Sequence, residues 1–185
     1  MNLKVFLELV EIRTKIASLF PFLTAIVFSL TYFKEGNFWN TVLFFIGMLV
    51  FDMTTTAINN LMDFQKAKSE TYKYENNVIG KEGLDPKKVG YLILSMLVFT
   101  LLIGLILSLK TGWLLLVMGG VVCFIGIFYT FGPIPLSRMP LGEIFSGVTM
   151  GLGIFAITVY INTPLQKVFY LVIDFKEGLF ALTGN

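Results

Sequence analysis

The sequence predicts an all-α protein: a polytopic helical bundle that crosses a membrane. Of the 185 residues, 56% are hydrophobic and only 14% are charged, whereas soluble domains carry about 25% charged residues. The mean hydropathy is +0.80. Five apolar stretches approach the length of about 20 residues that a membrane-spanning helix needs.

The five stretches follow one another along the chain, and we expect a single domain over residues 1–185. They cover residues 16–33, 38–58, 89–109, 113–131 and 141–161. A later segment, residues 164–182, is apolar only in pieces and is interrupted by Lys167, Asp174, Lys176 and Glu177. That segment is predicted to be a partial sixth span.

Residues 1–15 are predicted to form an amphipathic helix on the membrane surface. Glu8 and Glu11 interrupt the apolar core that a cleavable signal peptide requires. Apolar and charged residues instead recur at helical spacing on two neighbouring faces. The apolar face holds Val5, Leu9, Ile12 and Ile16, and the charged face holds Lys4, Glu8, Glu11 and Lys15.

The basic residues predict the orientation of the bundle. With five spans, the N-terminus and the loops 62–88 and 132–140 share one side, which carries ten of the 14 lysine and arginine residues. Because basic loops stay in the cytoplasm, we expect a multi-pass protein of the cell membrane with both polar loops cytoplasmic.

Composition also excludes several kinds of site. The chain has no histidine and one cysteine, Cys123, which lies in an apolar run and is interpreted as a packing residue. Zinc sites, serine–histidine triads and disulfide frameworks are therefore excluded. The net charge of +2 is too small to indicate a nucleic-acid partner.

Four polar residues are predicted to share one face of the second span. Asp52, Thr56, Asn59 and Asp63 follow one another at spacings of four, three and four residues. Asn59 and Asp63 would lie at the cytoplasmic end. A carboxylate inside a span costs about 2.5–3.5 kcal/mol on insertion scales, which favours a functional role. Two alternatives stay open: Asp52 is neutral or bonded to a threonine or backbone group within the bundle, and Asn59 to Asp63 form an ordinary helix C-terminus.

Lysines and carboxylates gather just after this face. They are Lys66, Lys68, Glu70, Lys73, Glu75 and Lys81, and the later polar loop adds Tyr129, Arg138 and Glu143. Mg²⁺ in proteins takes one or two carboxylates together with phosphate oxygens, and lysine adds compact positive charge. The pattern suits a phosphate group bridged by a hard cation, although the later loop also reads as a Gly-Pro turn between helices.

Four motifs together carry a resemblance to a known family. They are "EIRTKIASLFPFL" (11–23), "NNLMD" (59–63), "IGKEGLDPKKVG" (79–90) and "YTFGPIPLSRMPLGEIFSG" (129–147). In this order the chain resembles the UbiA-type intramembrane prenyltransferases, in the branch that prenylates 1,4-dihydroxy-2-naphthoate for menaquinone biosynthesis. "NNLMD" is similar to the family's first aspartate-rich motif, N-D-x-x-D. The resemblance covers roughly residues 11–161.

The chain departs from the family pattern in two places. Asn60 stands where the family usually has Asp. The second aspartate-rich motif of the family, between later helices, has no counterpart here, and "DFKEG" (174–178) lies in the wrong context. We therefore expect the chain to be the N-terminal part of a larger bundle.

The resemblance implies a Mg²⁺-dependent prenyltransferase in a lipid bilayer. It would transfer a polyprenyl group from polyprenyl diphosphate to an aromatic acceptor. The implied catalytic residues are Asp63, Asn59 and Tyr129, the implied diphosphate ligands are Lys66, Lys68, Lys81 and Arg138, and the implied metal ligands are Asn59, Asp63 and Glu70.

Several alternatives stay open beside this interpretation. The chain would be an inactive or structural homologue, a family enzyme for another acceptor (4-hydroxybenzoate, haem or a glycerol ether), or a transporter fragment with Asp52 and Asn59 on an ion path. A homo-oligomer or a missing C-terminal half would supply the rest of the site.

Overall fold

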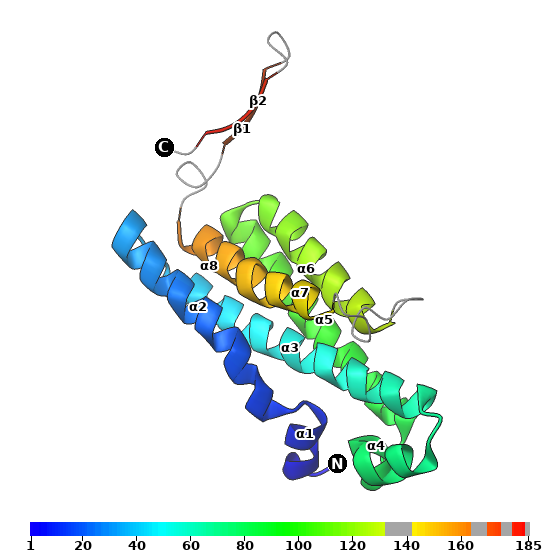
Figure 1. The fold of residues 1–185 in the computed structure, drawn as a ribbon. Helices are drawn as coiled ribbons and strands as arrows, with labels where there is room; N and C mark the ends of the chain where they lie inside the picture. Colours follow the sequence, from blue (N-terminus) through cyan, green and yellow to red (C-terminus); the bar gives the residue numbers. More distant parts are fainter. Residues whose placement is uncertain (132–141, 164–169, 175–178, 184–185) are drawn as a thin grey trace.

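The structure is a computed structural model that describes residues 1–131, 142–163, 170–174 and 179–183. Its main body is a bundle of long antiparallel helices (Figure 1). Three helical stretches are long and apolar enough to cross a membrane, namely Ile12–Phe33, Phe38–Lys66 and Pro86–Thr111. The predicted all-α membrane bundle is thereby confirmed.

The first stretch is made of three helical types in succession. A 3₁₀ turn, η1 (Ile12–Lys15), leads into α2 (Ile16–Phe28), which continues into the π-helical turn η2 (Ser29–Phe33). The stretch ends at Lys34, whose backbone is left-handed with φ 55°. It coincides with the first predicted span.

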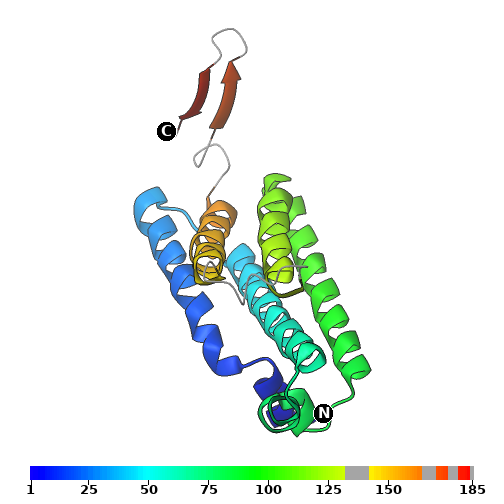
Figure 2. The same ribbon diagram turned by 45° about the vertical axis from the view of Figure 1, so that its right-hand side comes forward.

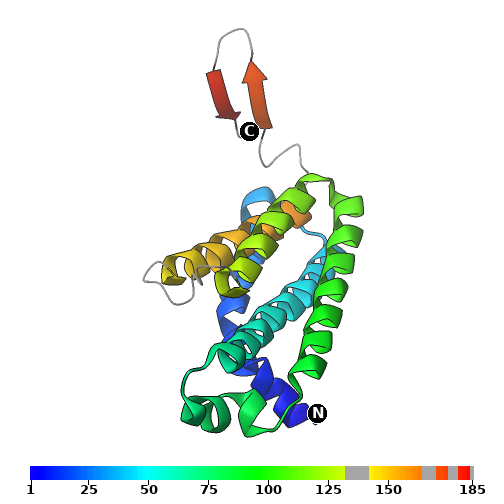
Figure 3. The ribbon, with the colours of Figure 1, turned by 90° about the vertical axis from the view of Figure 1, so that its right-hand side faces the viewer.

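The other two long helices begin at clear capping residues. The Asn37 side chain caps α3 (Phe38–Lys66) by accepting a 3.0 Å hydrogen bond from the Asn40 amide. The Asp85 carboxylate caps α5 (Pro86–Thr111) by accepting from the Lys87 amide at 2.9 Å, with Pro86 in the first turn. α3 and α5 pack side by side (Figure 3), and a Cβ at Gly47 would lie 2.9 Å from Ile103 Cγ2.

The fourth and fifth predicted spans are also helical. α6 (Leu114–Phe131) follows α5 after Gly112, and the last stretch comprises α7 (Gly142–Gly147), the π-helical turn η5 (Val148–Gly153) and α8 (Ile154–Asn162). Their apolar parts, Leu114–Phe128 and Val148–Asn162, are shorter than the three long stretches. Figure 2 shows α3 between α2 and α5.

The N-terminal helix differs from its prediction. α1 (Leu3–Leu9) ends at Val10, and the chain then turns sharply at Glu11, whose φ is 49°. Val5 and Leu9 are buried as expected, but Ile16 is 58% exposed. The predicted amphipathic N-terminal helix is therefore present over Leu3–Leu9 but does not extend to residue 15, because the chain breaks after two turns and re-enters the bundle along a different axis.

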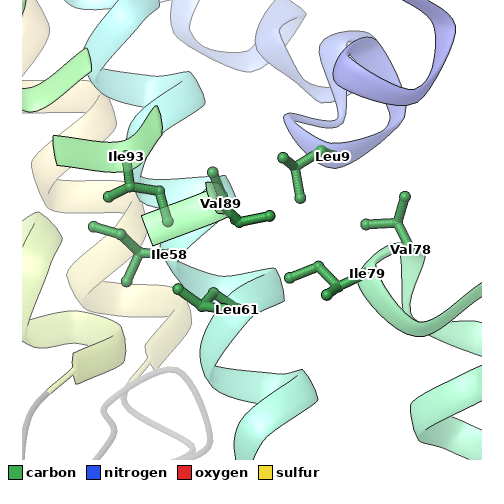
Figure 4. Packing of buried hydrophobic residues seen from close by; sticks show 8 residues of the cluster. Leu9, Ile58, Leu61, Val78, Ile79, Val89 and Ile93 are labelled. Atoms are coloured by element: carbon green, nitrogen blue, oxygen red, sulfur yellow. The ribbon is translucent and has the colours of Figure 1, made fainter. Parts of the chain in front are cut away.

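A hydrophobic cluster fastens this N-terminal region to the end of α3. It joins α1, α3, α5 and the short helix α4 (Val78–Lys81), which follows the π-helical turn η3 (Tyr72–Asn76). Its labelled members in Figure 4 are Leu9, Ile58, Leu61, Val78, Ile79, Val89 and Ile93. The segment after α3 is thus packed against the bundle through its apolar side chains.

The last described elements form a β-hairpin. β1 (Tyr170–Asp174) pairs antiparallel with β2 (Leu179–Thr183), with Tyr170 opposite Thr183 and Asp174 opposite Leu179. The described part of residues 164–182 is therefore extended, and the partial sixth span predicted there is not helical.

Candidate functional site

The polar face of α3 lines a cavity inside the bundle. The cavity has a volume of about 450 Å³ and is enclosed by η1, α2, α3, α5, α6 and the last helical stretch. Along α3 its lining changes from Phe44, Gly47, Met48 and Phe51 to Asp52, Thr55, Thr56 and Asn59. The opposite walls, from α5 and α6, are almost entirely apolar. The cavity is therefore amphipathic, with its polar lining toward the C-terminal end of α3.

Asp63 lies one helical turn beyond Asn59, and both side chains are half-buried. The predicted face is therefore present as far as Asn59, with Asp63 following at the end of α3 where the chain leaves the bundle. Both residues carry oxygen atoms of the hard type that Mg²⁺ accepts.

The strongest polar contacts in the cavity belong to Lys15 and Asp52. Lys15 Nζ donates to Asp52 Oδ1 at 2.7 Å, to the Asp52 carbonyl at 3.2 Å and to Thr56 Oγ1 at 2.6 Å. These three bonds use all three ammonium protons. Ser18 Oγ lies 2.7 Å from Asp52 Oδ2. Asp52 is thus bonded within the bundle, as its structural alternative expected, but the partners of its carboxylate are Lys15 and Ser18 rather than a threonine or a backbone group.

Lys15 differs most from its predicted surroundings. Helical spacing predicts it on the charged face of a surface helix, but it is only 4% exposed and bonds Asp52 and Thr56 on α3. The sequence did contain a signal: a carboxylate inside a span requires a counter-charge, and Lys15 stands at the start of the neighbouring span. Burying one ion of such a pair without the other is strongly unfavourable, so the two charges fix α2 against α3.

Asn60 has a structural role near the C-terminal end of α3. Its Nδ2 donates to the Leu9 carbonyl at 3.0 Å and to Glu11 Oε1 at 3.3 Å, and its own carbonyl accepts from Asn77 Nδ2 at 2.9 Å. The side-chain amide of Asn60 therefore joins α3 to the end of α1, and its main-chain carbonyl joins α3 to Asn77, just before α4. An aspartate at position 60 would place its carboxylate against two acceptors, the Leu9 carbonyl and Glu11 Oε1.

We expect Asn60→Asp to lower the free energy of unfolding by about 1–3 kcal/mol, because it replaces two donated hydrogen bonds by contacts between acceptors. Denaturation of the purified protein in lipid nanodiscs measures this loss. Asn76→Asp, at an exposed position on η3, is the matched control and should unfold like the wild type. A gain in Mg²⁺ affinity in Asn60→Asp without loss of stability would contradict the structural role.

The lysines that were predicted to bind phosphate lie in two different places. Lys66 and Lys68 are exposed at and just beyond the end of α3, and Glu70 is exposed in the same segment. Lys81 Nζ lies 3.1 Å from Glu8 Oε1, with the two side chains 49% and 41% exposed. The exposed Lys81 pair is weak, so it leaves Lys81 able to exchange partners.

Two of the predicted residues cannot be placed at atomic detail. Tyr129 belongs to α6, but its side chain lies outside the described part of the chain, as does the whole of Arg138. Within the described residues no three His, Cys, Asp or Glu side chains gather at one point. The metal set Asn59, Asp63 and Glu70 therefore stays a prediction.

The fold and the cavity define a helical membrane protein that holds an amphipathic space between its spans. The chain belongs to the UbiA prenyltransferase family, whose model matches residues 18–175. It is 29% identical over 161 residues to 1,4-dihydroxy-2-naphthoate octaprenyltransferase of Bacillus subtilis (strain 168), an alignment that covers 84% of this chain and 50% of that protein. The chain thus spans about half the length of this curated relative. No solved structure matches the chain.

Proposed function

We propose that the protein transfers a polyprenyl group from polyprenyl diphosphate to an aromatic acceptor, with 1,4-dihydroxy-2-naphthoate as that acceptor and Mg²⁺ as the metal. Family membership and the name of the Bacillus subtilis relative support the reaction class and the acceptor. We also propose that the polar loops 62–88 and 132–140 face the cytoplasm, where a charged diphosphate is available.

The amphipathic cavity is the observation that carries this proposal. A polyprenyl diphosphate is a hydrocarbon tail with a highly charged head, so it requires an apolar space that is joined to a polar one. The apolar walls from α5 and α6 suit the tail. The polar end at Asn59, followed by Asp63, Lys66 and Lys68, suits the head.

Asn59 and Asp63 are the residues that would hold the metal, with Glu70 as a further oxygen ligand. Their amide and carboxylate oxygens fit the preference of Mg²⁺ for hard ligands shared with phosphate oxygens. The bound ion would supply charge neutralisation of the diphosphate. Lys66, Lys68, Lys81 and Arg138 would bind the remaining phosphate oxygens as point charges or in bidentate fashion.

In the proposed reaction the bond between the prenyl C1 and the diphosphate oxygen breaks, and the electron pair leaves with the diphosphate. The developing negative charge would be stabilised by these cations, an effect typically worth several kcal/mol where such groups are preorganised. Tyr129 would shield the allylic cation with its ring. The electron-rich ring of the acceptor then forms the new carbon–carbon bond, and in the naphthoate branch the ring carboxylate leaves as carbon dioxide.

A transfer assay tests this function. Protein in nanodiscs is incubated with radiolabelled polyprenyl diphosphate and 1,4-dihydroxy-2-naphthoate, and the lipid-soluble product is counted. We expect product with Mg²⁺ and a loss to background with a chelator, because an unneutralised diphosphate is a poor leaving group. Parallel reactions with 4-hydroxybenzoate and a glycerol phosphate acceptor test the acceptor. Product from one of these alone would contradict the naphthoate, and no product from any acceptor would contradict the enzyme.

A further inference from the structure

One hydroxyl group in the cavity lacks a hydrogen-bond partner within the structure. Thr149, on η5, lines the cavity, and its Oγ1 is buried with no partner among the described residues. A buried polar group without a partner costs about 1–3 kcal/mol, and native proteins retain few of them. Such a group at the wall of a cavity is therefore well placed to serve a ligand.

Other buried threonines of these helices either have a hydrogen-bond partner or lie away from the cavity. Thr163 Oγ1, at the C-cap of α8, also has no partner among the described residues, but Thr163 does not line the cavity. Thr54 and Thr158, both fully buried, donate to the carbonyl four residues earlier at 2.6 and 2.7 Å. Thr149 differs because it lies inside the π-helical turn Val148–Gly153. Single π-turns within α-helices occur frequently at functional sites. The Thr149 hydroxyl, which makes no hydrogen bond to its own helix, thus lies within an irregular turn of that helix.

The contacts of two glycines give the position of Thr149 along the bundle. A Cβ at Gly153 would lie 3.0 Å from Val122 Cγ2, and a Cβ at Gly126 would lie 3.3 Å from Thr55 Cγ2. α6 and the last helical stretch run in opposite directions (Figure 1). One turn back from Gly153 is Thr149, and one turn forward from Val122 is Gly126. Thr149 therefore lies near the level of Thr55.

This level is deeper than the proposed diphosphate site. Thr55 precedes Asp63 by eight residues, which is about 12 Å along a helix. The neighbouring cation, Lys15, has its three protons engaged by Asp52 and Thr56. An uncharged hydroxyl at this depth suits a neutral oxygen on a flat, mostly apolar molecule. It suits neither a diphosphate, which needs cations, nor a prenyl tail, which has no polar atom.

We propose that Thr149 is a specificity-determining residue whose hydroxyl hydrogen-bonds a ring oxygen of the aromatic acceptor. The assignment rests on the proposed function, because the aromatic acceptor is the substrate proposed there. It places the acceptor in the cavity between η5 and α3, on the membrane side of the diphosphate site. The acceptor's phenolic oxygen either accepts from Thr149 Oγ1 or donates to it.

The test is Thr149→Val, which removes the hydroxyl and keeps the shape. Its effects on stability and on binding should have opposite signs. The thermal midpoint of the ligand-free protein in nanodiscs should rise by roughly 2–4 °C, because an unpartnered buried hydroxyl is removed. The affinity for 1,4-dihydroxy-2-naphthoate should fall about tenfold, while binding of geranylgeranyl diphosphate with Mg²⁺ should be unchanged.

Thr158→Val is the matched control on α8. Its hydroxyl is satisfied by the Ile154 carbonyl at 2.7 Å, and the residue does not line the cavity. The midpoint of this variant should not rise, and its affinity for the acceptor should match the wild type.

The experiment distinguishes a failure of the Thr149 assignment from a failure of the proposed function. A wild type that binds and prenylates the acceptor, with an unchanged acceptor affinity in Thr149→Val, would overturn the assignment of Thr149 alone; a water molecule would then satisfy the hydroxyl. A wild type that binds none of the aromatic acceptors would overturn the proposed function together with the assignment.

Discussion

Lys15→Met should lower the free energy of unfolding by about 3–5 kcal/mol, the usual effect of removing one partner of a buried ion pair. The Asp52 side chain is only 12% exposed, and its sole ion-pair partner among the described residues is Lys15. Without the ammonium group, the carboxylate keeps Ser18 as a partner but stays an uncompensated charge between α2 and α3. Denaturation in nanodiscs measures the loss. Lys4→Met, at an exposed position on α1, is the control and should have little effect.

The double variant Lys15→Met, Asp52→Leu separates a structural ion pair from a ligand-binding lysine. Replacing both ions by apolar side chains is often neutral or stabilising, so the double variant should recover most of the lost stability and retain binding of polyprenyl diphosphate. If stability recovers but ligand binding stays lost, Lys15 acts on the ligand. If Lys15→Met alone unfolds like the wild type, the ion pair does not fix α2 to α3.

The spans could be predicted from the sequence because the formation of each membrane helix depends only on the residues within it. Length and hydropathy define a membrane helix, and all five predicted stretches are helical. The caps at Asn37 and Asp85 are equally local. The hairpin of β1 and β2 was missed because residues 164–182 alternate short apolar runs with charges, a pattern that favours neither a helix nor a strand clearly.

Features that depend on a partner distant in the sequence were not predicted. Helical spacing placed Lys15 on a charged surface face, yet Asp52, 37 residues away, draws it into the bundle. Asn60 is a departure from the Asp that the family usually has, and the sequence did not indicate that its amide bonds the Leu9 carbonyl. Thr149 carried no signal at all in the sequence, because its significance comes from a π-turn and a cavity formed by several helices.

The shared polar face on α3 was predicted correctly from Asp52 to Asn59, whereas Asp63 does not line the cavity. Asp52, Thr56 and Asn59 line one cavity, as their spacing indicated. The chemistry proposed for that face depends on Asn59 and Asp63 holding a cation-bridged diphosphate near the C-terminal end of α3. Their oxygens, and the exposed Lys66 and Lys68 just beyond, are the features of this chain that favour such a group.

The most direct measurement is calorimetric binding of geranylgeranyl diphosphate to the protein in nanodiscs, with and without Mg²⁺, in the wild type and in Asp63→Asn. We expect binding that requires Mg²⁺ and falls at least about 100-fold in the variant, since even outer-shell changes at metal sites cost 10–100-fold. Asp85→Asn is the control, because asparagine caps α5 as well as aspartate does. Equal affinity in Asp63→Asn, or binding that is indifferent to Mg²⁺, would contradict the account.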